Sequence, residues 1–297
     1  MAHEHHHHHQ VKGKRLFLTI ALNLSITIAE LIGGIISGSI SLISDAIHNF
    51  SDVISLVISY IANRLIKKSP TQSKTFGFKR SEILAAFINS ATLIILAIII
   101  FYNAIMRLLN PIEIAPNLVI YMAIASIAVN GLSVLFISKD SKNNMNIRSA
   151  YLHLFSDMLT SVAVLIGGLL MKYFQIYWID SVLSLIIAVY LLYMSWNIFK
   201  SSLRIIMQFT PENIDINMIA DDISTIDTVK NIHHVHVWQI NEHDIMFEAH
   251  IDLENNVSIS DFEKILEQAR EILLKYKITH ITLQPEYSVD DSKEIIV

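Results

Sequence analysis

Long apolar segments separated by short polar connections dominate the first two thirds of the chain. Six of them are each long enough to cross a hydrocarbon core of about 30 Å, which takes roughly 20 helical residues. Turn-forming residues separate several of them, as at Ser37-Gly38-Ser39 and Asn110-Pro111. The pattern predicts six transmembrane helices, near residues 16–36, 40–63, 83–106, 118–138, 149–171 and 179–199.

The pattern changes after Arg204, where charged residues become frequent and apolar runs become short. Two segments have apolar residues at helical spacing, near 216–226 and 261–276. Three shorter segments are strand-like, near 235–240, 245–253 and 279–283. The order helix, strand, strand, helix, strand is typical of a ferredoxin-like sheet. We therefore predict an α-helical membrane protein with a small cytoplasmic α+β domain, divided into a His-rich cytoplasmic arm (1–15), a six-helix transmembrane domain (16–204) and a metal-binding module (205–297).

The composition agrees with a membrane protein. Hydrophobic residues make up 53% of the chain and charged residues 16%, whereas about 25% of the residues in soluble domains are charged. The formal net charge of -5 offers no basic surface for nucleic acid. The chain has no cysteine, which excludes disulfides, thiolate metal sites and cysteine nucleophiles. Any transition-metal site must therefore be built from His, Asp and Glu.

Lysine and arginine are distributed unequally between the predicted loops. The N-terminal arm and residues 64–80, 139–148 and 200–204 hold most of those that precede the C-terminal module, whereas the three opposite loops hold only Arg107 and Lys172. The positive-inside rule then places both termini in the cytoplasm of a multi-pass protein of the cell membrane. The histidine tract in the arm either binds Zn²⁺ or Ni²⁺ loosely or is a purification tag, and the sequence leaves both open.

Few ionisable residues lie inside the six apolar segments, and two pairs of them share one spacing. His48 and Asp52 are four residues apart in the second segment, as are His153 and Asp157 in the fifth. Residues i and i+4 lie on one face of a helix, so each helix presents an imidazole beside a carboxylate. A charge in the bilayer core costs at least about 2.5 kcal/mol and indicates function by default. If the two faces meet, two nitrogens and two oxygens form a tetrahedral Zn²⁺ site.

Three more polar residues lie in the first two segments: Glu30 in the first, and Asp45 and Asn49 in the second. Glu30 and Asp45 could line a water path or complete the site, and Asn49 could orient a ligand through a hydrogen bond. The alternative is structural, because buried polar groups also hold membrane helices together. For the repeated His-x-x-x-Asp pair we favour metal binding, whereas for these three residues both interpretations stay open.

The two pairs also suggest what drives transport. Metal binding needs neutral histidine and ionised carboxylates, so protons and metal compete for the same lone pairs. The sequence contains no glycine loop of the ATP-binding kind. We therefore predict a proton-coupled Zn²⁺ antiporter and not an enzyme. The alternatives are a passive metal channel, which needs weak coordination at several sites, and a membrane metal sensor, which needs no ligands in the bilayer core.

A second group of histidines lies in the C-terminal module, on or near the predicted strands. Together with one carboxylate they could converge on one face as a sensing or stabilising metal site. These candidates are His233, His250, His280 and Glu286. Strand alternation places His234 and His236 on the opposite face from His233. The alternative is that each histidine is an ordinary hydrogen-bonded strand residue.

Taken together, these motifs resemble the cation diffusion facilitator family of zinc transporters, over most of the chain. The segment from Ser37 to Asp52 is similar to the family's S-G-S…D-A-x-H-x-x-x-D signature, and the segment from Phe76 to Glu82 to its Y-G-x-x-R-x-E motif. His153 and Asp157 match the pair in the fifth span. The cytoplasmic domain is matched by Thr210-Pro211, His236-Val237-Trp238, Gln284 and Glu286.

The resemblance implies a homodimer in the lipid bilayer that exports Zn²⁺ from the cytoplasm, with Cd²⁺ and Co²⁺ as further substrates, in exchange for protons. It implies that the transport site consists of His48, Asp52, His153 and Asp157. It also implies that His233, His250, His280 and Glu286 lie where the zinc-preferring branch binds regulatory Zn²⁺. His234 departs from the family pattern, in which an aspartate usually follows the first histidine.

Overall fold

The structure is a computed structural model that describes residues 13–138 and 145–296. Within the helices, side chains are described except at positions 13–21, 56, 59, 63, 136–137, 145–150 and 152–153. The predictions for the histidine tract and for most of the loop at 139–148 lie outside these residues. So does the side chain of His153, although its backbone lies in a helix.

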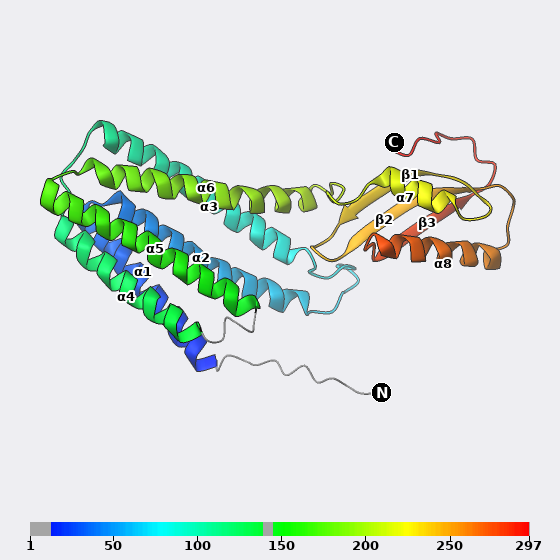
Figure 1. Cartoon of the computed structure of the whole chain (residues 1–297). Helices are drawn as coiled ribbons and strands as arrows, with labels where there is room; N and C mark the ends of the chain where they lie inside the picture. The colour runs from blue at the N-terminus through cyan, green and yellow to red at the C-terminus, as the bar shows by residue number, and fades with distance from the viewer. Residues whose placement is uncertain (1–12, 139–144, 297) are drawn as a thin grey trace. The chain divides into compact units, whose positions relative to one another are not determined.

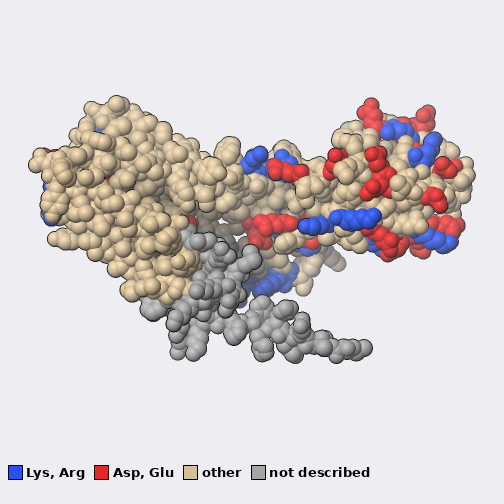
Figure 2. Space-filling view, in the orientation of Figure 1, with Lys and Arg blue, Asp and Glu red and all other residues tan. Residues whose placement is uncertain are grey.

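Six long helices occupy the positions that the apolar segments predict (Figure 1). They are α1 (Gly13–Ser37), α2 (Ile40–Ile66), α3 (Ser81–Leu109), α4 (Pro116–Ile137), α5 (Met145–Phe174) and α6 (Trp178–Ile206). Within the described residues, α2 to α6 are long and apolar enough to cross a membrane, and α1 contributes a shorter apolar stretch, Leu22–Ser37. Figure 2 shows almost no charged side chains over most of this helical part on the face in view. The chain is a multi-pass membrane protein.

The connection between α1 and α2 is a tight turn. Gly38 adopts a φ of 76°, a left-handed conformation that glycine reaches without steric cost. The N–H of Ser39 donates to the carbonyl of Gly34 (3.1 Å), and the guanidinium of Arg107 donates to the carbonyl of Gly38. These contacts satisfy carbonyl groups at the end of α1, where the helix leaves them without intrahelical partners.

A buried carboxylate from another helix caps the start of α2. Asp180, in the first turn of α6, accepts hydrogen bonds from the N–H groups of Ile40 (2.8 Å) and Ser41 (3.3 Å). It also accepts from the hydroxyls of Ser39 and Ser41, both at 2.5 Å. A negative charge is favourable at a helix N-terminus because the first N–H groups carry partial positive charge. Asp180 thereby ties α6 to the helix that bears His48 and Asp52.

The C-terminal module has the predicted order of helices and strands, with a three-stranded sheet. Strands β1 and β2 are antiparallel, β2 and β3 are parallel, and the order in the sheet is β1-β2-β3. One face of the sheet packs against the two helices around a core that includes Ile219, Phe247, Ile251 and Leu273. The elements are α7 (Ile216–Ser224), β1 (Val229–Gln239), β2 (Ile245–Leu253), α8 (Ile259–Lys275) and β3 (His280–Glu286).

The other face of this sheet is polar. Alternate residues of β2 that point away from the core include Glu248, His250 and Asp252. The register places His250 opposite His233 of β1, and Asp252 opposite Glu286 of β3. Neighbouring strands thus bring histidines and carboxylates together on the face that the helices leave uncovered.

Candidate metal sites

The first cluster lies between α2 and α5. Nδ1 of His48 lies 3.7 Å from Oδ2 of Asp52, and Nε2 of His48 lies 3.7 Å from Oδ1 of Asp157. Helix α2 therefore places its imidazole between the two carboxylates, as the i, i+4 spacing predicts. His153 lies one helical turn before Asp157 on α5, and its side chain is outside those described. The structure brings together three of the four residues expected at the transport site.

Exposure changes steadily across this cluster. The side chain of Asp157 is 2% exposed, that of His48 17% and that of Asp52 26%. The cluster is therefore closed at Asp157 and accessible at Asp52.

The accessory residues form a buried polar group next to the cluster. Nδ2 of Asn49 donates to Oε2 of Glu30 (3.4 Å), and the hydroxyl of Ser161 donates to Oδ2 of Asp45 (3.4 Å). Glu30, Asp45 and Asn49 are at most 1% exposed. Within the described residues, Oδ1 of Asp45 and Oδ1 of Asn49 accept no hydrogen bond. Both atoms are therefore free to accept one from water or from a proton carrier.

Two serines that the sequence analysis missed extend this group. The hydroxyls of Ser126 on α4 and Ser161 on α5 lie 2.9 Å apart, and the Ser161 oxygen also lies 3.0 Å from the backbone carbonyl oxygen of Asp157. Polar side chains from α1, α2, α4 and α5 thus meet beside the cluster. Serine is common in apolar helices, so only the packing of these helices singles out the two residues.

The second cluster lies on the polar face of the sheet in the C-terminal module. Oε1 of Glu286 lies 2.7 Å from Nδ1 of His250, and Oε2 lies 3.2 Å from Nε2 of His233. Asp291, which follows β3, lies 3.5 Å from Nε2 of His233. One ligand atom from each of these four residues lies within 4.8 Å of all the others. Among the residues that the structure describes, His233, His250, Glu286 and Asp291 are thus close enough together to bind one metal ion.

The expected position of His280 needs correction. His280 is exposed, begins β3 and pairs with Met246, whereas Glu286 ends the same strand. At about 3.3 Å per residue the two are roughly 20 Å apart along the strand, too far to bind one ion within a single chain. The structure brings together His233, His250 and Glu286, and it places Asp291 where His280 was expected.

The expectation that His234 and His236 lie on the opposite face from His233 was also wrong. His236 pairs with Glu248, which points away from the core as His250 does. A bulge interrupts the pairing of β1 with β2 between His233 and His236, and His234 has a φ of 54°. A bulge breaks the alternation of side chains between the two faces. As a result the ring of His234 stacks on that of His250, with centroids 4.7 Å apart. His234 is thus a neighbour of the cluster.

A hydrogen bond orients the ring of His233 for metal binding. It is completely buried, and its Nδ1 lies 3.1 Å from Oδ1 of Asn231. Because that amide oxygen can only accept, the contact suits the tautomer that carries its proton on Nδ1 and leaves a lone pair on Nε2. Nε2 is the atom that faces Glu286 and Asp291.

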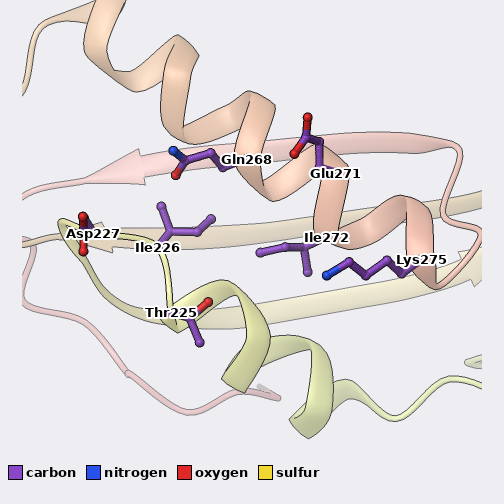
Figure 3. A pocket seen from close by; sticks show the side chains of 7 residues that line it. All are labelled: Thr225, Ile226, Asp227, Gln268, Glu271, Ile272 and Lys275. Atoms are coloured by element: carbon purple, nitrogen blue, oxygen red, sulfur yellow. The ribbon is translucent and has the colours of Figure 1, made fainter.

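A surface pocket elsewhere in the module has none of these features. It lies between the α7–β1 connection and α8 and is lined by Asp227, Glu271 and Lys275, among others (Figure 3). None of its lining residues belongs to either cluster, and it contains no histidine. We therefore do not assign it to metal binding.

Comparison with known proteins gives matches along nearly the whole chain. Residues 16–207 match the cation efflux transmembrane domain, and residues 211–288 match the cytoplasmic domain of cation efflux proteins. The chain is 38% identical over 288 residues to the cadmium, cobalt and zinc/H(+)-K(+) antiporter of Bacillus subtilis (96% of this chain, 92% of the relative). It is 34% identical over 290 residues to the zinc transporter ZitB of Pectobacterium atrosepticum (97% and 89%). It is 31% identical over 286 residues to the metal cation efflux system protein CzcD of Cupriavidus metallidurans (96% and 89%).

Proposed function

The chain belongs to the cation efflux family, the cation diffusion facilitators, and on that premise we propose that it exports Zn²⁺ from the cytoplasm in exchange for protons. The relatives named above as zinc, cadmium and cobalt transporters support Cd²⁺ and Co²⁺ as further substrates. The observation that carries the proposal is the convergence of His48, Asp52 and Asp157 from two apolar helices.

The transport site consists of these three residues and His153, which the helix places one turn from Asp157. Imidazole nitrogen with carboxylate oxygen suits Zn²⁺, whereas Mg²⁺ and Ca²⁺ prefer oxygen ligands alone. In the absence of metal, His48 and the two aspartates can take up protons at the same lone pairs that would bind the ion. Loading with metal therefore releases protons, and unloading takes them up. A site that faces the two sides of the membrane in turn converts this competition into antiport.

A passive channel and a membrane metal sensor are the competing functions. A channel needs coordination weak enough for rapid exit, but four His and Asp ligands around one ion bind tightly. A sensor could work with the cluster of the C-terminal module alone and would not need charged groups between α2 and α5. The tight coordination therefore argues against a channel, and the position of the cluster between two apolar helices argues against a sensor.

The cluster of the C-terminal module serves as a regulatory Zn²⁺ site in this proposal. Four ligand atoms within 4.8 Å of one another need only a small contraction, because tetrahedral Zn²⁺ at about 2.0–2.2 Å from each ligand places them roughly 3.4 Å apart. His233, His250, Glu286 and Asp291 would hold the ion, which would pin β1, β2 and β3 to the segment after β3. The proposal includes a homodimer in the cell membrane with both termini cytoplasmic, which the match to the cytoplasmic domain and the loop charges support.

The test is Zn²⁺ flux into proteoliposomes with and without a pH gradient, for the natural chain, Asp157→Ala and Ser156→Ala. We expect flux that rises with the gradient and is lost in Asp157→Ala. Ser156 is exposed on the same helix, so its variant should transport normally and serves as the control. Flux that ignores the gradient would contradict antiport, and normal flux in Asp157→Ala would contradict the transport site.

A further inference from the structure

The segment after β3 crosses the polar face of the sheet and brings a lysine into the second cluster. Nζ of Lys293 lies 3.1 Å from the carboxylate of Asp252 and 3.3 Å from Oε2 of Glu286. It also pairs with Asp291 and lies 3.5 Å from Nε2 of His233. The ammonium thus touches three of the four residues that would hold the metal.

The backbone of this segment is docked on β1, at the bulge. The N–H of His234 donates to the carbonyl of Glu294 (3.1 Å), and the N–H of Val235 donates to the carbonyl of Ile295 (2.8 Å). β1 is an edge strand, so these groups have no strand partner on that side. Ile295 packs against the hydrophobic core of the module. The bulge that turns His234 therefore also provides the donors that hold Lys293 over the cluster.

Charge explains why a lysine is held there. Asp252 and Glu286 are buried and Asp291 lies beside them, so three carboxylates share a small volume with His233 and His250. Buried carboxylates at this distance repel one another unless a cation lies between them. Nζ of Lys293 lies against all three carboxylates and supplies that cation.

We propose that Lys293 is a built-in competitor of the regulatory metal, which holds the metal-free cluster together and must withdraw when a divalent cation binds. The ammonium and the metal need Oε2 of Glu286, the carboxylate of Asp291 and the same side of Nε2 of His233, so they cannot occupy the cluster together. Withdrawal of Lys293 loosens residues 293–296 from β1, whereas Asp291 stays on the cluster as a metal ligand. Metal binding thereby causes this segment to move. Competition from the lysine determines the metal concentration at which the movement occurs.

This inference rests on the proposed regulatory site, and it predicts that removal of the lysine tightens metal binding. If Lys293 occupies the cluster about nine tenths of the time, the apparent affinity rises about tenfold without it, because only the unoccupied fraction can bind. The measurement is Zn²⁺ titration of the purified full chain in an Asp52→Ala, Asp157→Ala background, which removes two ligands of the transport site. The variants are Lys293→Met, Lys293→Arg and His250→Ala, with Lys275→Met on α8 as the matched control.

The chain has no cysteine, so a single spin label at Ile296→Cys can report on the segment itself. We expect Zn²⁺ to increase the mobility of the label in the natural chain. In Lys293→Met the label should be mobile before Zn²⁺ is added and binding should be about tenfold tighter, whereas Lys293→Arg should restore the natural behaviour and Lys275→Met should match it.

Two outcomes separate failure of the inference from failure of the site. If His250→Ala weakens binding while Lys293→Met changes neither affinity nor label mobility, the site stands and the competitor is disproved. If His250→Ala binds Zn²⁺ as the natural chain does, the regulatory site is wrong and the inference falls with it.

Discussion

The two His and carboxylate clusters of this chain differ in the source of their positive charge. The six apolar segments predicted from the sequence contain no lysine or arginine. The cations that balance Asp52 and Asp157 must therefore come from solution, as protons or as metal. In the C-terminal module Lys293 supplies a cation from the chain itself. A site that depends on exchangeable cations suits transport, and a site with a tethered competitor suits a threshold for sensing.

They also differ in how the chain builds them. His48, Asp52 and Asp157 come from two helices, and the first two lie on one face because they are four residues apart. His233, His250 and Glu286 come from three strands, so the register of the sheet decides which of them meet. The fourth residue, Asp291, comes from a segment outside the strands. Each half of the helical site is thus encoded locally, whereas every residue of the site on the sheet depends on pairing between distant parts of the sequence.

Neutralising one carboxylate in each cluster should give the largest difference. Asp157→Asn should lower Zn²⁺ flux on the order of 100-fold or more, since even the loss of a group that orients a ligand costs about 10- to 100-fold in metal affinity. Glu286→Gln should retain flux and lose only its dependence on cytosolic Zn²⁺. Proteoliposome flux at several Zn²⁺ concentrations measures both. Equal losses in the two variants would show that the clusters do not have separate roles.

The next prediction concerns the anchor of α2. Asp180→Asn removes the charge and turns one acceptor at the helix start into a donor that faces N–H groups. Leaving such buried donors unsatisfied costs about 1–3 kcal/mol, so thermal unfolding in detergent should occur at a lower temperature. Ser184, also on α6, donates to the backbone carbonyl of Asp180 (2.7 Å) and is the control. If Asp180→Asn and Ser184→Ala unfold at the same temperature, the carboxylate does not stabilise the start of α2.

These differences explain what the sequence could predict. The apolar segments identified the long helices, because length and hydropathy alone define such segments. The i, i+4 spacing predicted that His48, Asp52 and Asp157 belong to one metal site, and the structure places these three residues together. In the module, the order of elements was predicted correctly and His233, His250 and Glu286 do converge. The bulge that turns His234 could not be predicted, since it follows from pairing with β2 and with residues 294–295.

The residues after β3 were missed for a related reason. Asp291 and Lys293 belong to no helix or strand, so no periodicity marks them. Charged residues near a chain end usually interact with solvent, and only their contacts with Glu286 and Asp252 distinguish these two. For His280 the error was different. Its residue type suggested a ligand, but its position at the start of β3 rather than its end excludes it from the cluster within one chain.

A smaller effect tests that correction directly. His250→Ala should weaken binding of Zn²⁺ to the second cluster about tenfold or more, because an imidazole ligand is lost, whereas His280→Ala should leave it unchanged. Titration of the purified full chain with Zn²⁺, in a background that lacks Asp52 and Asp157, measures both. If His280→Ala weakens binding as much as His250→Ala does, the cluster is completed by a histidine from a second copy of the chain, and the comparison of two sites within one chain no longer holds.

The smallest expected effect concerns the ion pair between the α2–α3 connection and the β1–β2 turn. Nζ of Lys79 lies 2.7 Å from Oδ2 of Asp244, and the hydrogen bond from Lys79 lowers the pKa of Asp244 below its ordinary value. A group with a depressed pKa adds stability above its unfolded pKa, near 4, and that contribution disappears as the pH falls through the folded value. Both side chains are partly exposed, so Lys79→Ala should cost only about 0.2–1 kcal/mol at pH 7.

The free energies of unfolding of Lys79→Ala and of the natural chain should therefore differ at pH 7 and converge below about pH 4. The control is Lys67→Ala, because Lys67 is exposed just after α2, and its free energy of unfolding should match that of the natural chain at every pH. A difference that persists at the lower pH would mean that Lys79 acts through contacts other than this ion pair.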